Sequence, residues 1–453
     1  MNTKSILFVN PWIHDFAAYD FWSKPLGLLQ VGGFLQQYGF DVQLLDCLDR
    51  YHPVLTKLGD MPPEKPDGTG KYWREIIPKP AVLDHIPRHY ARYGMPRELV
   101  REQLLALPRQ PDLVLLTSIM TYWYTGVKEM RDLLKALFPD TPIILGGIYA
   151  SLCPDHAAVT VKPDYLFTGH DLSSLLGLIG KILQSQVPAT VLHDSISLQV
   201  AWDLYPDLHT MTMMTSRGCP NRCSFCASHA LYSGYYRYAP GDVFRDILYW
   251  HERTGFQHLA FYDDALLHKP DDYIKPLLKM IAKANLPIKL HTPNGLQPRY
   301  VDDEFAELFR QAGGHTVRLS FESVNPERQR DMSSKVTTTE LTHAVHCLKH
   351  AGIPANQIGV YIMMGLPGQT MQEVSDSVDY AANLNVKVNL ASFSPIPGTK
   401  EWDRLLASGE WTLQNDLLLT NTTVYPLWTR QYGYDTVQTF VSRIREQLRS
   451  IET

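Results

Sequence analysis

The sequence predicts an α/β protein with an N-terminal doubly wound parallel sheet, a following partial (β/α)6 barrel and a small C-terminal helical cap. Apolar runs of strand length alternate with amphipathic runs of helix length, first over residues 5–169 and again from residue 210 onward. Continuous apolar strands joined by helices are typical of parallel sheets covered on both faces. We therefore expect three domains, at residues 1–195, 205–400 and 401–453.

Five strands are expected in the first domain, at residues 5–10, 41–46, 112–118, 142–147 and 164–169. The helix after the first strand places Leu28, Val31 and Leu35 on one face, and Gly39 ends it. A second helix is expected at 127–138. This alternation predicts a Rossmann-like domain whose ligand lies beyond the carboxyl ends of the strands.

Residues 50–110 interrupt the alternation. They contain nine prolines, and eleven Lys and Arg against seven Asp and Glu. The segment is too long for a plain connection, so we expect a folded excursion that acts as a lid or is a surface insertion without a role. Its "GTGK" is not a phosphate-binding loop, because Tyr72 follows the lysine.

The second alternation predicts six strands, at residues 211–218, 258–264, 288–294, 316–323, 358–365 and 387–394. One connecting helix shows the pattern well, with Leu341, Val345 and Leu348 on one face and Gly352 at its end. Six consecutive βα units favour an open partial barrel. The last fifty residues contain three tryptophans and an amphipathic helix, and they are expected to form the cap.

Composition excludes several classes of protein. The chain has 453 residues, is 45% hydrophobic and has a net charge of −5, from 42 Lys and Arg against 47 Asp and Glu. This balance argues against a nucleic-acid partner. No run of about 18 apolar residues predicts a membrane span, and the N-terminus shows no cleavable signal pattern. Six cysteines in a chain of this length do not form a disulfide framework, so we expect a protein of the reducing cytoplasm.

Half of the cysteines lie in "RGCPNRCSFCASHA", as Cys219, Cys223 and Cys226, directly after the first barrel strand. Three thiolates on one loop can hold three irons of a 4Fe–4S cluster and leave the fourth open to a substrate or cofactor. A structural zinc site is the alternative, but the paired spacing that is typical of zinc is missing. The other three cysteines are interpreted as buried apolar residues.

The CxxxCxxC loop after the first strand of a partial barrel resembles the radical S-adenosylmethionine (radical SAM) superfamily. The resemblance covers about residues 205–400 and implies that the open iron binds S-adenosylmethionine, which is reductively cleaved to a radical. It places Phe225 against the adenine. It also implies cofactor-binding roles for polar residues at the following strand ends, namely Asp263, Asp264, Asn294, Ser320 and Glu322.

The order of the domains resembles the cobalamin-binding subgroup of that superfamily. The resemblance places cobalamin at the carboxyl ends of the N-terminal strands, against Ser118, Thr121, Gly146 and Gly147. Glycine allows a bulky ligand to approach the backbone closely. The DxHxxG string that supplies a cobalt ligand in other cobalamin domains is missing, so we expect no histidine of this chain to ligate cobalt.

These features predict a radical SAM enzyme that uses cobalamin to transfer a methyl group to an unactivated carbon. A cyclisation or rearrangement without methyl transfer, a non-catalytic sensor and a zinc-stabilised Rossmann-like protein are the alternatives. We expect a small-molecule or peptide substrate and an electron donor such as flavodoxin or ferredoxin. No side chain is nominated as a catalytic acid or base, because the cofactors carry the chemistry.

Overall fold

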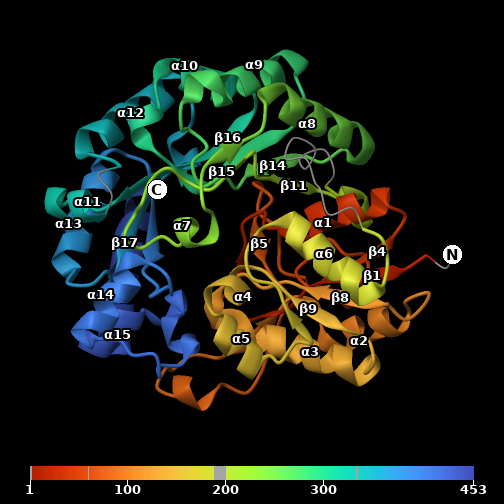
Figure 1. The fold of residues 1–453 in the computed structure, drawn as a ribbon. Helices are drawn as coiled ribbons and strands as arrows, with labels where there is room; N and C mark the ends of the chain where they lie inside the picture. Colours follow the sequence, from red (N-terminus) through yellow and green to blue (C-terminus); the bar gives the residue numbers. More distant parts are fainter. Residues whose placement is uncertain (1–2, 60, 188–199, 333–334, 453) are drawn as a thin grey trace. The chain divides into compact units, whose positions relative to one another are not determined.

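A computed structural model describes residues 3–59, 61–187, 200–332 and 335–452. The chain divides into two compact units. The first contains residues 1–209 and 249–255, and the second contains residues 210–248 and 256–453. The segment 401–453 lies within the second unit. Figure 1 shows both units as ribbons coloured along the sequence.

The first unit is built on a five-stranded parallel sheet with the order β10-β9-β8-β1-β4. This is the doubly wound order 2-1-3-4-5. All five strands are parallel, and the order in which they are added to the sheet reverses between β1 and β8. The strands are β1 (Ser5–Asn10), β4 (Asp41–Asp46), β8 (Leu113–Leu116), β9 (Ile143–Leu145) and β10 (Tyr165–Leu166). All five were predicted, and each lies within or on its predicted range.

Helices cover both faces of this sheet in Figure 1, with α1 and α6 on one side and α2 and α3 on the other. On the α1 side, Phe8 packs among apolar side chains of α1 and α6. The approach is close, because a Cβ atom at Gly32 of α1 would lie 2.8 Å from the Phe8 ring. The helices are α1 (Leu26–Gln37), α2 (Arg97–Leu105), α3 (Tyr124–Leu137), α4 (Ile148–Leu152), α5 (Pro154–Thr160) and α6 (Leu172–Leu183).

The excursion at residues 50–110 is folded against the segment that follows β1. Its strands pair antiparallel with that segment, in a three-stranded sheet β2-β7-β6 and a two-stranded sheet β3-β5. A small core of Ile13, Leu48, Tyr72 and Tyr93 lies beneath them. The strands are β2 (Ile13–Asp15), β3 (Tyr19–Asp20), β5 (Gly70–Lys71), β6 (Arg74–Ile76) and β7 (Ala91–Tyr93).

The second unit contains a six-stranded parallel sheet with the order β11-β14-β15-β16-β17-β18. Because the order follows the sequence, β11 and β18 are the edges of an open barrel, as predicted. The strands are β11 (Thr210–Met213), β14 (His258–Phe261), β15 (Lys289–Leu296), β16 (Gly314–Glu322), β17 (Ile358–Met364) and β18 (Lys387–Ser392). A short antiparallel pair, β12 (Ser216–Arg217) and β13 (Tyr236–Arg237), brackets the cysteine loop.

Helices alternate with the barrel strands and continue into the cap. Trp402, Trp411 and Trp428 of the cap are buried, and the first two pack with Met363 of β17 and with Phe393. The helices are α7 (Ser228–Leu231), α8 (Pro240–Thr254), α9 (Ile274–Ala284), α10 (Asp303–Gln311), α11 (Pro326–Met332), α12 (Thr338–His350), α13 (Met371–Asn383), α14 (Lys400–Ser408), α15 (Pro426–Tyr432) and α16 (Tyr434–Glu452). None of the helices in the described part of the chain is long and apolar enough to cross a membrane.

Candidate active site

The cysteine loop runs from β12 to α7 and is fixed by backbone hydrogen bonds. The Ser224 amide donates to the Met332 carbonyl at 2.9 Å, and the Glu401 amide donates to the Ser224 carbonyl at 3.0 Å. The loop is therefore tied to the end of α11 and to the start of α14. It begins at Gly218, where φ is +74° and a Cβ atom would lie 2.0 Å from the Gly234 carbonyl oxygen, so only glycine fits there.

The three thiols of this loop are free, with Cys223 buried and Cys219 and Cys226 half-buried. The Ser228 amide donates to the Cys226 sulfur at 3.5 Å, and the Asn221 side chain donates to the Cys219 sulfur at 3.7 Å. Burial raises the pKa of Cys226 to about 11 and also raises the pKa of Cys219. Burial therefore favours the protonated form of the Cys219 and Cys226 thiols until a cation replaces the protons.

The donor set fits an iron–sulfur cluster. The three thiols act on one another electrostatically, so they lie close together. Within the described residues no three His, Cys, Asp or Glu side chains converge as a single metal ion would need. A cubane does not require such convergence, because each thiolate binds a different iron. Cysteine thiolates are the usual ligands of a 4Fe–4S cluster.

Phe225 lies between the second and third cysteines and is half-buried against the apolar cluster of the cap. That cluster includes Met332, Met363 and Trp402. The Phe225 ring therefore contributes to packing between the cysteine loop and this cluster. The predicted contact with adenine stays a prediction.

The paired carboxylates after β14 have different surroundings. Asp263 is 3% exposed and accepts from the Thr215 amide at 3.1 Å, the Thr215 hydroxyl at 2.8 Å and the Ser216 hydroxyl at 2.5 Å. Burial raises its pKa to about 6, although these donors oppose the rise. The Asp263 carboxylate therefore anchors the chain between β11 and the cysteine loop.

Asp264, in contrast, contacts Ser228, the first residue of α7 after the cysteine loop. It accepts from the Ser228 hydroxyl at 2.5 Å and acts electrostatically on Cys219 and Cys226. Burial raises its pKa as well. The predicted contact of either acid with S-adenosylmethionine stays a prediction.

Two further predicted residues fix the ends of β15 and β16. The Asn294 side chain donates to the Tyr262 carbonyl at 2.8 Å, which ties β15 to the chain after β14. The Ser320 hydroxyl donates to the Gly295 carbonyl at 3.0 Å. A Cβ atom at Gly295 would lie 2.2 Å from the Ser320 hydroxyl, so the glycine allows this contact.

Glu322 ends β16 with φ at +73°, a left-handed conformation that is rare for a side chain of this size. Its carboxylate pairs with Lys335 at 3.0 Å, and the two side chains are only 9% and 13% exposed. Burial opposes the charge of Lys335, but Glu322 and the nearby Cys223 hold its pKa above the usual value. A buried ion pair therefore lies next to the cysteine loop.

The sequence reasoning missed Lys335 and Ser228. Lys335 lies thirteen residues after Glu322 in a connection without periodicity, so no pattern marks it. Ser228 directly follows the loop motif, and the carboxylates at 263–264 were already candidates. A search for their hydrogen-bond partners among nearby hydroxyl residues could have found it.

The predicted residues of the first unit lie at the carboxyl ends of β8 and β9. The Ser118 hydroxyl donates to the Gly146 carbonyl at 2.7 Å, and a Cβ atom at Gly147 would lie 2.2 Å from the Ser118 carbonyl oxygen. Thr121 begins the next turn and is buried. A Cβ atom at Gly146 would be 3.8 Å from its nearest neighbour, the Phe167 carbonyl oxygen, which is an ordinary contact, so this position could accept a small side chain. Their contact with cobalamin stays a prediction.

Comparisons with known proteins give a family match for part of the second unit. Residues 213–381 match the model of the radical SAM superfamily. An uncharacterized methyltransferase of Pyrococcus horikoshii is 25% identical over 68% of this chain and 71% of its own length. The cytidylyl-2-hydroxyethylphosphonate methyltransferase of Streptomyces wedmorensis is 21% identical over 88% of this chain and 80% of its own length.

The fold is similar to that of TsrM, a radical S-adenosylmethionine methyltransferase of Kitasatospora setae. The TM-score is 0.66 and the identity 18%, over 92% of this chain and 80% of TsrM with tryptophan and a SAM analogue bound. A second TsrM structure, with cobalamin and a [4Fe-4S] cluster bound, has a TM-score of 0.62 over 90% of this chain and 75% of TsrM.

The barrel unit thus belongs to the radical SAM superfamily, whose members use a 4Fe–4S cluster and S-adenosylmethionine. The chain therefore contains a radical SAM domain and is an enzyme, and the predicted α/β architecture is confirmed.

Proposed function

We propose that this enzyme is a cobalamin-dependent radical SAM methyltransferase that acts on an unactivated carbon. The observation that carries the proposal is the combination of a three-cysteine loop at the mouth of a six-stranded barrel with a doubly wound N-terminal unit. Methyltransferases among its relatives, and a similar fold in a protein that binds cobalamin and the cluster, support it. When bound, these cofactors supply the radical chemistry and the methyl group.

The chain would hold the cluster through Cys219, Cys223 and Cys226. Asp264 and the Glu322–Lys335 pair line the surroundings of the loop and provide charges of both signs for the amino and carboxylate groups of S-adenosylmethionine. Phe225 offers an apolar surface for the adenine. Asp263, Asn294 and Ser320 fix the strand ends through backbone and hydroxyl hydrogen bonds, and thereby orient the residues that make contact.

The cobalamin would lie at the carboxyl ends of β8 and β9, against Thr121, Gly146 and the turn that Ser118 and Gly147 stabilise. Because the DxHxxG string is missing, we expect no imidazole of this chain on cobalt. The EPR spectrum of the cobalt(II) form checks this. Superhyperfine splitting from a protein nitrogen would contradict the expectation.

A product assay tests the function. The anaerobically reconstituted enzyme, hydroxocobalamin, S-adenosylmethionine and a reductant are combined with candidate small-molecule and peptide substrates. Methylation by radical chemistry produces both 5′-deoxyadenosine and S-adenosylhomocysteine. Formation of 5′-deoxyadenosine alone, with substrate conversion, would favour cyclisation or rearrangement. A reduced, cluster-loaded protein that cleaves no S-adenosylmethionine would favour a sensor.

The electron donor and the cellular compartment are part of the same proposal. A one-electron donor such as flavodoxin or ferredoxin is required to start the reaction, and the cytoplasm provides both this donor and reduced thiols. Replacing dithionite by reduced flavodoxin in the assay checks the donor. Turnover with dithionite but none with reduced flavodoxin or ferredoxin would contradict this choice.

A further inference from the structure

The folded excursion and α3 together form an open pocket in the first unit, with a volume of about 500 Å³. This volume is in the range of small-molecule sites, roughly 300–1,000 Å³. Its walls come from α3, from β7 and from residues 77–80 of the excursion. None of its lining residues belongs to the barrel unit or to the candidate cobalamin residues, so the pocket is separate from the sites described above.

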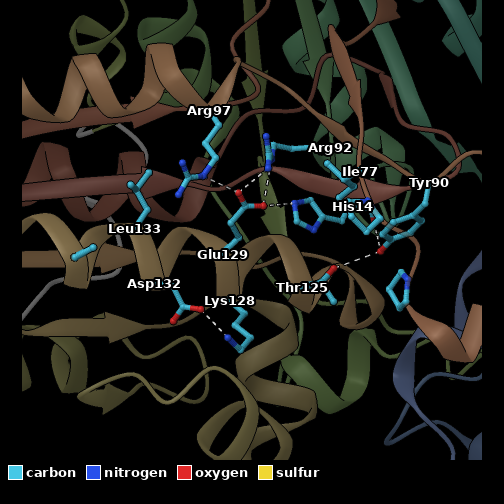
Figure 2. A pocket seen from close by; sticks show the side chains of 13 residues that line it. His14, Ile77, Tyr90, Arg92, Arg97, Thr125, Lys128, Glu129, Asp132 and Leu133 are labelled. Carbon is cyan, nitrogen blue, oxygen red and sulfur yellow. Dashed lines mark hydrogen bonds and ion pairs between the residues drawn. The ribbon is translucent and has the colours of Figure 1, made fainter.

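The polar centre of the pocket is the carboxylate of Glu129 on α3. Figure 2 shows Arg92, Arg97 and His14 arranged around it. Arg92 donates to both carboxylate oxygens, at 3.2 and 2.7 Å, Arg97 donates through Nε at 3.1 Å, and Nε2 of His14 lies 3.0 Å away. Burial alone would raise the pKa of Glu129, but His14 and Arg92 hold it below the usual value. One ionised carboxylate is therefore surrounded by two permanent cations and an imidazole.

Positive charge prevails along the lining. The pocket has three Lys or Arg residues, Arg92, Arg97 and Lys128, against the two acids Glu129 and Asp132. An adjoining pocket of about 430 Å³ shares Ile77 and Tyr90 with it. This second pocket adds two more cations, Lys79 and Arg88, and no acid to the lining. The two linings together contain five Lys or Arg residues and two acids.

Two further acids that pair with these cations, Glu75 and Glu98, have exposed side chains. Glu75, which pairs with Arg92, has a side chain that is 49% exposed, and Glu98, which pairs with Arg97 at 3.4 Å, is 73% exposed. Water and salt screen the Arg97–Glu98 pair, which contributes at most about 1 kcal/mol. This pair therefore compensates the charge of Arg97 only weakly, whereas Arg92 is 10% exposed and stays paired with Glu75 at 2.6 Å. Arg97 is 40% exposed, and the bond to Glu129 occupies only its Nε.

The wall also has an apolar part, formed by Ile77, Pro78, Pro80, Leu133 and Ala136. A ligand that satisfies both parts of the wall has an acidic group and an apolar body. We propose that this pocket binds a small organic anion, a carboxylate or phosphate on an apolar body, and that Arg97 contacts its charged group. The excess of Lys and Arg in residues 50–110 then has a function, since most of these lining cations come from that segment.

Calorimetric titration of the full-length protein tests the proposal. Phenyl phosphate and benzoate are the anionic probes, and benzyl alcohol is the neutral control. We expect saturable binding of at least one anion, weakened by added salt, and no comparable binding of the alcohol. The two anions distinguish a phosphate site from a carboxylate site. Arg97→Gln should weaken the binding about tenfold, since it removes one charge-assisted contact.

The matched control is Arg109→Gln. Arg109 belongs to the same unit and is similarly exposed, at 37%, but it pairs with Asp41 outside the pocket. Its replacement should leave anion binding unchanged. Equal binding by the Arg97→Gln and Arg109→Gln proteins, or anion binding no stronger than that of benzyl alcohol, would overturn the proposal. If Arg97→Gln fails to fold, Lys128→Gln on the exposed face of α3 replaces it.

A third variant separates this inference from the proposed function. Cys223→Ala removes a cluster ligand, but it is expected to bind the anionic probe as the unaltered protein does. Loss of anion binding in this variant, with the fold intact by circular dichroism, would contradict a separate site. A protein that binds the anionic probe but transfers no methyl group would contradict the proposed function and not the anion site.

Discussion

At the residue scale, the described part of the site depends on buried groups that neutralise one another. Glu322 and Lys335 form an ion pair at 3.0 Å, and neither side chain is more than 13% exposed. Such a pair is strongly destabilised when one partner is removed, because the other charge stays buried without compensation. Sequence reasoning found Glu322 from its place at the end of a strand. It did not find Lys335, because only the folded connection brings the lysine back to β16.

Lys335→Met should lower the free energy of unfolding by about 3–5 kcal/mol, because it leaves the Glu322 charge alone. The double variant Lys335→Met with Glu322→Gln should recover much of that loss. Urea unfolding of the single and double variants, under anaerobic conditions, measures both values. Additive losses in the double variant would show that the two side chains do not act as a pair.

The two adjacent glycines after β9 provide a second test at this scale. Gly147→Ala places a Cβ atom 2.2 Å from the Ser118 carbonyl at a φ of +94°, so we expect a loss of about 1–3 kcal/mol or more. Gly146→Ala meets nothing closer than 3.8 Å and should be well tolerated. Thermal unfolding measures the difference between the variants.

Cobalamin titration of the same two variants tests the proposed ligand contact. If the corrin lies against Gly146, the Gly146→Ala protein should be stable but bind hydroxocobalamin more weakly. Equal affinity of this variant and the unaltered protein would contradict the contact at that residue.

At the element scale, long and strongly patterned segments were predictable and short ones were not. The six barrel strands and the five strands of the first sheet were predicted because they fall in apolar-rich runs of strand length that alternate with helical patterns. Strands β2, β6 and β7 have three residues each, too few to show a period, and they are stabilised by pairing with distant segments. The pocket beside α3 could not be predicted for the same reason.

The chain between β11 and the cysteine loop provides the prediction at this scale. Asp263 accepts three hydrogen bonds from Thr215 and Ser216, so it acts as a clamp on that segment. Asp263→Ala leaves three buried donors unsatisfied and should lower stability by about 3 kcal/mol or more, at roughly 1–3 kcal/mol per group. Asp263→Asn keeps part of the hydrogen bonding and should lose less. Chemical unfolding of the two variants checks this order, and a larger loss in Asp263→Asn would contradict the clamp.

At the scale of the whole molecule, three histidines lie in a row across the neighbouring barrel strands β14, β15 and β16. His258 and His291 are joined by a hydrogen bond of 2.9 Å, and the rings of His291 and His315 meet edge to face. Burial, followed by the charges of His258 and His315, lowers the pKa of His291 to about 2. Below about pH 6.5 the His291 side chain binds a proton in the unfolded state but stays neutral in the folded state.

The stability of the enzyme should therefore fall as the pH drops below about 6.5. His291→Asn should make the decline between pH 6.5 and 5 shallower, by up to about 1.4 kcal/mol per pH unit. His350→Asn, at a side chain that is 75% exposed, is the matched control and should leave the slope unchanged. Equal slopes for His291→Asn and the unaltered protein would show that this imidazole is not kept neutral by the fold.

The proposed chemistry requires that the three cysteines after β12 hold a 4Fe–4S cluster on which S-adenosylmethionine is cleaved. The most direct measurement compares iron content and 5′-deoxyadenosine formation in anaerobically reconstituted proteins. We predict that the unaltered enzyme and Cys347→Ala, whose cysteine lies on α12, bind about four irons and cleave S-adenosylmethionine. Cys223→Ala is predicted to lose both properties. A Cys223→Ala protein with full iron content and unchanged cleavage would contradict the account.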